Sequence, residues 1–181
     1  LQSMHAFVAR CAGTAEARAR AVIVPTRGAA EALRRTIEDL RVASLDAAVI
    51  LPDLVTRAEF YRRLHAGVPG LPPQLTEFDR EVIFRRAAQD TEAQGTPAPF
   101  RLRAGLIVEV LAFYDELRRR DRTVAAFARN MVESLEPNAD TDRGAERLLR
   151  LTRFLAAAFE VFEARVQATG CLDEHGLRAR L

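Results

Sequence analysis

The stretch 21–40 constrains the fold of this chain more than any other. It opens with four consecutive apolar residues, 21–24, of which three are β-branched. Such a run is typical of a short strand that is buried on both faces of a parallel sheet. Pro25 then ends the strand, because proline has no N–H to donate. Thr26 can cap the helix that follows, in which apolar residues recur at helical spacing.

This strand–turn–helix unit places Thr26 and Arg27 at the carboxyl end of a parallel strand. Open α/β sheets bind their ligands at that end. Gly28 lets the backbone approach a bound group closely. Many βα units share this pattern, so the unit taken alone also fits a purely structural role.

A second apolar run, 46–52, has the same character and predicts a second buried strand centred on 49–51. The helix between the two runs is the crossover connection that parallel pairing requires. We therefore predict that 22–24 and 49–51 lie side by side in one sheet.

A further extended piece, 53–56, leads into a predicted helix over 58–66, which Thr56 can cap. Arg27 and Arg57 each follow an extended segment at what we expect to be the same sheet edge. Both guanidinium groups could then contact a single phosphate backbone.

The first unit resembles motif Ia of the UvrD/Rep-type superfamily 1 helicases. In that family a strand runs into Thr-x-x-Ala-Ala and a helix, and the threonine contacts single-stranded nucleic acid. Thr26, Ala29 and Ala30 match those positions, and Leu33 matches the apolar position that follows. The resemblance implies a nucleic-acid contact at Thr26.

The second unit resembles motif Ib of the same helicases. There an extended threonine precedes a helix with phenylalanine four positions on and an apolar residue at eight. Thr56, Phe60 and Leu64 match these positions, and Arg63 matches a frequent basic one. Arg57 departs from the family, which has an aromatic residue there. The resemblance implies nucleic-acid contacts by Thr56 and Arg63.

The Gly/Pro-rich segment 67–73 is the clearest boundary in the chain. We predict an α/β plus α fold: a short parallel sheet with flanking helices over 1–66, followed by a mainly helical domain over 71–181. Helices are predicted over 76–89, 101–120, 123–134 and 143–169, with a last one capped by Asp173. Their inward-facing residues are predicted to include Val82, Ile83, Phe84 and Ala87, then Leu102, Leu106, Val110, Phe113 and Leu117, then Leu148, Leu151, Leu155, Phe159, Phe162 and Val166. An N-terminal helix over 4–13 is predicted to face inward with Phe7, Val8 and Cys11.

The tail 172–177 carries a third resemblance. UvrD-like and AddB-like proteins place an apolar-Asp-x-x-x-Leu segment after their helical insertion, and Leu172, Asp173 and Leu177 match it. The resemblance implies that the chain is a fragment of a helicase–nuclease subunit, with part of motor domain 1A in 1–66 and the helical 1B insertion in 71–181.

All 27 basic residues are arginine, and no lysine is present. A phosphate loop of the Gly-x-x-x-x-Gly-Lys-Ser/Thr type therefore cannot be built from this sequence. We predict no catalytic residues, no ATP hydrolysis and no cofactor in this chain. The resemblance implies that ATP and Mg²⁺ belong to the parent protein, if its motor is intact.

No metal site is predicted, because the three histidines are scattered and the acidic clusters at 140–146 and 173–175 stand at helix starts, where caps are expected. Cys11 and Cys171 lack a metal-type spacing and are predicted to be thiols in a reducing cytoplasm, with a terminal disulfide as the alternative. No apolar run approaches the roughly 20 residues of a membrane span. We therefore expect a cytoplasmic protein without a membrane partner.

The densest basic cluster is formed by Arg118, Arg119, Arg120 and Arg122 at the end of a predicted helix. A helix C-terminus favours cations, so we prefer a solvated helix end to a phosphate contact as the interpretation of this cluster. Arg27 and Arg57 are the better candidates for nucleic acid.

The leading hypothesis is a non-catalytic fragment of a UvrD-like or AddB-like DNA helicase–nuclease subunit in DNA repair or recombination. Its sheet edge, with Thr26, Arg27, Thr56, Arg57 and Arg63, would contact single-stranded DNA, and the parent would join a helicase–nuclease partner subunit. The alternative is a helical protein–protein interaction module without a nucleic-acid role. An unrelated small enzyme ranks third, since no catalytic set is visible.

Overall fold

The computed structural model describes residues 2–11, 15–42 and 50–180. These residues form two compact units, Leu1–Gly70 and Leu71–Leu181, hereafter unit 1 and unit 2. The division falls within the Gly/Pro-rich segment 67–73. The fold is mainly helical with a short parallel sheet, which confirms the α/β plus α prediction.

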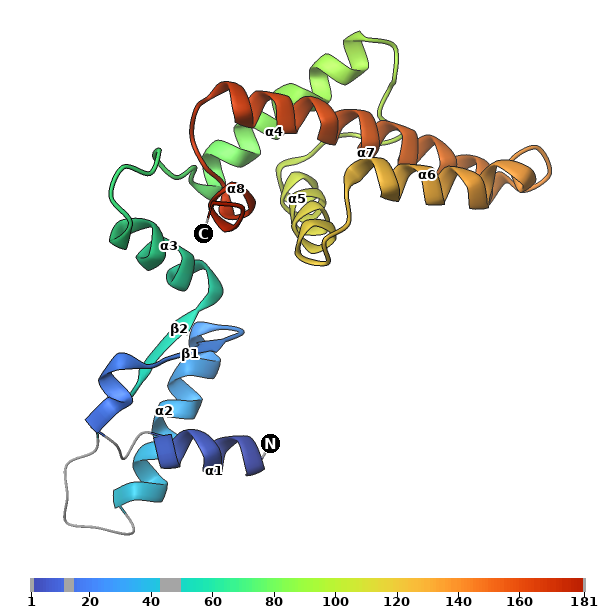
Figure 1. Ribbon diagram of the computed structural model, residues 1–181. Helices are drawn as coiled ribbons and strands as arrows, with labels where there is room; N and C mark the ends of the chain where they lie inside the picture. Colours follow the sequence, from blue (N-terminus) through green and yellow to red (C-terminus); the bar gives the residue numbers. More distant parts are fainter. Residues whose placement is uncertain (1, 12–14, 43–49, 181) are drawn as a thin grey trace. The chain divides into compact units, whose positions relative to one another are not determined.

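Unit 1 contains the sheet and the helices that flank it (Figure 1). Two parallel strands alternate with helices, as in other βα units. Its elements are α1 (Gln2–Cys11), the 3₁₀ helix η1 (Ala15–Ala19), β1 (Ala21–Val24), α2 (Arg27–Val42), β2 (Asp53–Thr56) and α3 (Arg57–Gly67).

The sheet has β1 as predicted, but the predicted partner strand is wrong. β1 pairs in parallel with Asp53–Thr56, so that Val24 stands opposite Thr56. Residues 50 and 51 lie outside any strand, and 46–49 lie outside the described residues. Pro52 explains the shift, because it has no N–H for the ladder. The ladder begins one residue later, where the Asp53 N–H donates to the Arg20 carbonyl at 2.9 Å.

The core of unit 1 lies between α1, α2 and one face of the sheet. Val8, Val24 and Ile37 are buried in it, together with Ala30 and Leu33. The prediction that Phe7 faces inward is wrong, because its side chain is 58% exposed. The helix α1 packs against α2, and Val8, the residue after Phe7, is buried instead.

Unit 2 is helical. α7 packs against both α4 and α6, and Figure 1 shows α6 and α7 lying side by side. α4 continues past Gln89, where the predicted helix ends, to Ala93. The elements are α4 (Glu77–Ala93), α5 (Ala104–Arg119), α6 (Val124–Leu135), the 3₁₀ helix η2 (Glu136–Asn138), α7 (Arg143–Ala168) and α8 (Glu174–Arg178).

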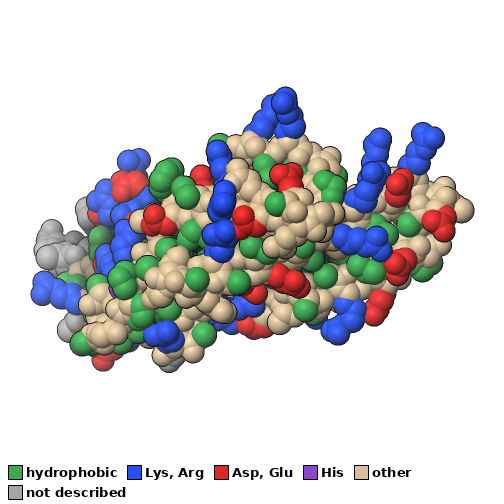
Figure 2. Space-filling model, turned by 90° about the horizontal axis from the view of Figure 1, so that it is seen from above, with side chains coloured by type: hydrophobic (Ala, Val, Ile, Leu, Met, Phe, Trp, Pro, Cys, Tyr) green, Lys and Arg blue, Asp and Glu red, His purple; other side chains and the backbone are tan. Residues whose placement is uncertain are grey.

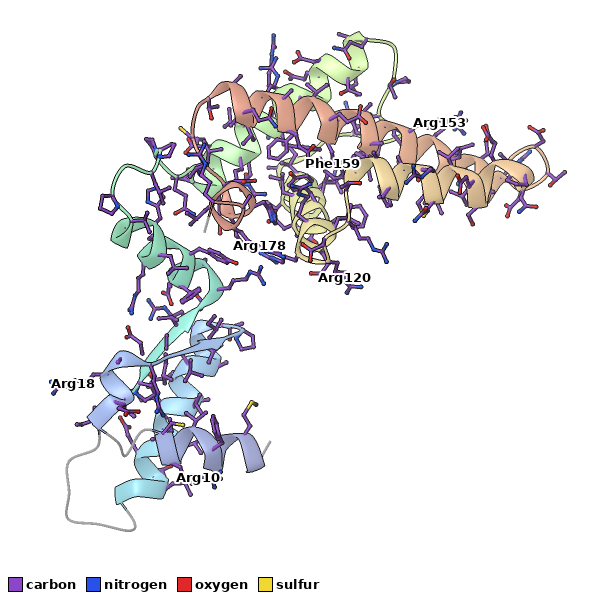
Figure 3. The ribbon with its side chains drawn as sticks, viewed as in Figure 1. Arg10, Arg18, Arg120, Arg153, Phe159 and Arg178 are labelled. Atoms are coloured by element: carbon purple, nitrogen blue, oxygen red, sulfur yellow. The ribbon has the colours of Figure 1, made fainter. Side chains whose placement is uncertain are left out.

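The core of unit 2 is a cluster of aromatic rings around Phe159 (Figure 3). The centroid of its ring lies 5.7 Å from that of Phe84 and 5.2 Å from that of Tyr114. Rings at such distances contribute more than their buried area alone. The four phenylalanines with no exposed surface are Phe84, Phe154, Phe159 and Phe162.

Two predicted inward residues face solvent instead: Val82 and Leu148 are 51% and 40% exposed. Phe113 is 38% exposed, but its ring centroid lies 5.3 Å from that of Phe127 and 6.4 Å from that of Phe159. Tyr114 and Leu149, each next in sequence to one of them, are buried. These helices carry apolar residues on several sides, so the sequence pattern alone does not tell which side is buried. Tyr114 can be buried because its hydroxyl donates to Glu163 Oε1 at 3.0 Å.

A partly buried carboxylate joins three elements of unit 2. Asp115 of α5 accepts two hydrogen bonds from Arg80 of α4, at 2.5 and 3.1 Å, and one from His175 Nε2 of α8 at 2.9 Å. Burial raises the pKa of Asp115, but the hydrogen bonds from His175 and Arg80 outweigh it and bring the pKa to about 2. As predicted, Asp173 caps α8, accepting from the Gly176 N–H at 2.7 Å.

We expect Asp115→Ala to cost about 3–5 kcal/mol of the free energy of unfolding, because it leaves the Arg80 guanidinium buried without its acceptor. The chain has two tyrosines and no tryptophan. Urea unfolding of the Tyr61→Phe protein, followed by tyrosine fluorescence, therefore reports on Tyr114 and so on unit 2. Asp140→Ala, at an exposed position, is the matched control. A cost equal to that of the control would contradict the role of Asp115.

The same carboxylate predicts an acid dependence. Its folded pKa of about 2 lies below the ordinary value of 3.8, so the unfolded state takes up the proton first as the pH falls. The stabilisation is complete above pH ~4, is lost as the pH falls through ~2, and amounts to about 2 kcal/mol. Asp115→Asn should remove this share of the pH dependence of urea unfolding. Identical pH profiles for the two proteins would contradict it.

Candidate nucleic-acid interface

The carboxyl edge of the sheet is where the two βα junctions of unit 1 meet. β1 ends at Val24 and α2 begins at Arg27, whereas β2 ends at Thr56 and α3 begins at the next residue. Because Val24 and Thr56 are paired, both helices begin at the same edge. We call Thr26, Arg27, Thr56, Arg57 and Glu59 the rim.

Thr26 caps α2, as the sequence predicts. Its Oγ1 accepts a hydrogen bond from the Ala29 N–H at 3.1 Å, and its carbonyl accepts from the Ala30 N–H at 3.0 Å. The residue is exposed. A Cβ at Gly28 would meet only Thr26 Oγ1, at an ordinary 3.8 Å. Packing within the chain therefore does not require glycine here, which leaves the first turn of α2 open to an approaching group.

Thr56 and Glu59 form a reciprocal cap at the start of α3. The Thr56 N–H donates to Glu59 Oε2 at 2.9 Å, and the Glu59 N–H donates to Thr56 Oγ1 at 3.4 Å. The hydrogen bond from the Thr56 backbone lowers the pKa of Glu59, although burial opposes it. The carboxylate therefore stays charged at neutral pH.

Arg27 joins the two junctions. Its guanidinium forms an ion pair with Glu59 Oε1, so the first residue of α2 contacts the first turn of α3. The side chain of Arg27 is 77% exposed and that of Glu59 only 15%. The arginine thus lies on the surface while its partner is set into the protein.

Arg57 lies beside an aromatic side chain. Its guanidinium carbon is 5.5 Å from the centroid of the Tyr61 ring, within cation–π range. The Tyr61 ring in turn meets Phe60 edge-on at 5.9 Å. No residue of α3 is fully buried, so these rings remain partly open to solvent.

Arg63 stands apart from the other predicted site residues. It forms an ion pair with Asp53, the first residue of β2, whereas Thr56 is the last. The structure therefore brings Thr26, Arg27, Thr56 and Arg57 to one edge and directs Arg63 toward the amino end of the strand. Both carboxylate partners, Glu59 and Asp53, are absent from the sequence-predicted site.

Glu59 is the rim residue that sequence reasoning missed, although a signal for it was present. Thr-x-x-Glu ahead of a helix is the capping-box pattern, and Thr56 to Glu59 matches it. The contact with Arg27 had no such signal, because it joins residues that only the fold brings together.

Comparison with protein-family models, with curated proteins and with solved structures found no match to this chain.

Within residues 2–11, 15–42 and 50–180, no group of three or more His, Cys, Asp or Glu side chains is placed to hold a metal ion. None of the helices in those ranges is long and apolar enough to cross a membrane. Cys11 of unit 1 and Cys171 of unit 2 are each partly exposed.

We expect Thr56→Ala to destabilise unit 1 by about 1 kcal/mol, because it removes the cap of α3. Thr56→Ser keeps the hydroxyl and should cost much less. In the Tyr114→Phe protein, tyrosine fluorescence reports on Tyr61 of α3, so urea unfolding measures the effect locally. Equal unfolding midpoints for the alanine and serine variants would contradict the capping role.

Proposed function

We propose that the chain is a non-catalytic part of a UvrD-like or AddB-like helicase–nuclease subunit in DNA repair or recombination, and that its rim contacts single-stranded DNA. The observation that carries the proposal is the Arg27–Glu59 contact, which holds two threonine–arginine pairs at one sheet edge. The threonine of each resemblance to the helicase motifs, Thr26 and Thr56, lies there, and an arginine follows each of them.

The chemistry of the rim suits a phosphodiester backbone. The starts of α2 and α3 carry backbone N–H groups and the positive ends of two helix dipoles. Arg27 adds an exposed guanidinium, which matches two oxygens of a phosphate at once. Tyr61 and Phe60 are partly exposed near Arg57 and offer faces on which unpaired bases stack.

The remaining parts of the proposal concern the parent protein. ATP and Mg²⁺ would act on residues outside this chain, which has no lysine for a phosphate loop. The parent would work in the cytoplasm and join a helicase–nuclease partner subunit. The chain's own share is to hold single-stranded DNA.

The interaction-module alternative stays a hypothesis. Under this hypothesis, α7 would carry an exposed apolar patch for a partner protein. Leu148 is the large hydrophobic residue of α7 that is exposed, at 40%. A single exposed leucine is an ordinary surface feature, so we propose no second function from it.

We expect the double variant Arg27→Ala/Arg57→Ala to bind a fluorescein-labelled single-stranded oligonucleotide more weakly, by roughly tenfold at low salt. The slope of log K against log[salt] should flatten by about 0.7 for each phosphate that the variant no longer neutralises. Fluorescence anisotropy across a salt series measures both quantities.

The matched control is Arg20→Ala/Arg35→Ala. It removes the same charge from unit 1 at two arginines that also have carboxylate partners, Glu16 and Glu31. Glu59→Gln should act in the opposite direction and strengthen binding, since it releases Arg27. If Arg27→Ala/Arg57→Ala binds as tightly as the wild type, or no more weakly than Arg20→Ala/Arg35→Ala, the rim does not contact DNA.

A further inference from the structure

We propose that unit 2 carries a second phosphodiester-binding surface, formed where the C-terminal end of α5 meets α8. We call it the α5–α8 patch. The proposal rests on the proposed function for its class of ligand, but it uses no residue of the rim. The patch comprises Arg118, Arg119, Arg120, Arg122, Arg178 and Arg180.

The end of α5 turns sharply within the patch. The Arg122 N–H donates to the Leu117 carbonyl at 3.0 Å, and the Asp121 N–H donates to the Arg118 carbonyl at 3.2 Å. This pair of hydrogen bonds ends a helix when the first residue after the helix, here Asp121, has a left-handed backbone conformation. Asp121 takes that conformation, with φ of 55°, where glycine is usual. The turn brings Arg122 back beside the helix end.

Side chains of α8 meet this turn. Arg178 contacts Asp121 at 2.8 Å, and Arg119 donates two hydrogen bonds to Glu174 at 3.2 and 3.3 Å. Figure 3 shows the labelled Arg120 and Arg178 on these neighbouring elements. Two arginine groups that are far apart in sequence thus form one surface.

Arginines outnumber their ion-pair partners in the patch. Four of its six guanidinium groups are paired with carboxylates, those of Glu163, Glu174, Glu116 and Asp121. Asp173 lies in the wall of the same cavity as Arg180. In Figure 2 basic and acidic side chains are interspersed over the face drawn.

Arg122 and Arg180 are the two arginines of the patch whose charge is not paired with a carboxylate side chain of the described residues. Both are exposed, and neither has a carboxylate side chain as partner within the described ranges. The helix dipole accounts for cations in the last turn of α5, such as Arg118 and Arg119. It does not account for Arg122 beyond that turn, nor for the convergence with α8.

The surface at the patch is hollowed. Two cavities of about 410 and 210 Å³ share Arg118, His175 and Ala179 in their walls. Arg180 lines the first and Arg178 the second. Guanidinium groups at the border of a hollow can reach one phosphate from several directions, which favours bidentate contacts.

The test uses the full chain with Arg122→Ala/Arg180→Ala. Binding is measured by anisotropy across a salt series, with labelled single-stranded and duplex oligonucleotides of equal length. We expect roughly tenfold weaker binding to at least one of them at low salt, and a slope flatter by about 0.7 to 0.9 for each phosphate left without its arginine. Circular dichroism and the urea midpoint check that the variant is folded.

The matched control is Arg129→Ala/Arg147→Ala, which removes two exposed arginines from α6 and α7. An unchanged affinity and slope in the patch variant would overturn the proposal, as would an equal loss in the control. So would binding of polyglutamate in the absence of oligonucleotide binding, which would indicate an acidic protein partner. If Arg122→Ala/Arg180→Ala loses affinity while Arg27→Ala/Arg57→Ala binds as tightly as the wild type, the result supports binding at the patch and rejects only the proposed contact at the rim.

Discussion

The parallel pairing of β1 with β2 determines where the residues of the rim lie. With Val24 opposite Thr56, both following helices begin at one edge, and Arg27 comes within reach of Glu59. Paired residues of neighbouring strands share a face, so Val24 and Thr56 lie on one side of the sheet and Ile23 and Val55 on the other. Val24 and Val55 are both buried, so each face is covered in part. The positions of the two arginine–threonine pairs follow from the register.

In unit 2 the comparable constraint is the partly buried charge of Asp115. α8 has only five residues, too few for a helix to be stable by itself. It is held by the fully buried Leu177, by His175 on Asp115, and by the contact of Arg119 with Glu174. The place of Arg178 and Arg180 at the end of α5 therefore depends on a carboxylate in the core.

Local signals made much of the fold predictable. β1 could be predicted from a β-branched run closed by Pro25, and the starts of α2, α3 and α4 from a threonine at each cap. The four rim residues named from the sequence lie at one edge because each threonine–arginine pair stands at the carboxyl end of a strand. All of these features are set by residues within a few positions of one another.

Long-range features could not be predicted in the same way. The sequence offers two segments as partners for β1, 46–52 and 53–56, and β1 pairs with the second, which follows Pro52. The partner of Arg63 is ten residues away, and that of Arg80 is 35 away. No periodicity encodes such pairs. The same holds for the α5–α8 patch, since residues 118–122 meet 174–180 only after the fold is complete.

The two arginine surfaces differ in what a phosphate must displace. At the rim, Glu59 uses Oε1 for Arg27 and Oε2 for the Thr56 N–H. Arg27 can therefore leave for a phosphate without opening the cap of α3, so binding exchanges one anionic partner for another. In the α5–α8 patch, Arg122 and Arg180 have no carboxylate to give up within the described residues. We therefore expect the patch to contribute more to affinity per arginine in the proposed complex, and the rim to contribute orientation through backbone N–H groups in fixed geometry.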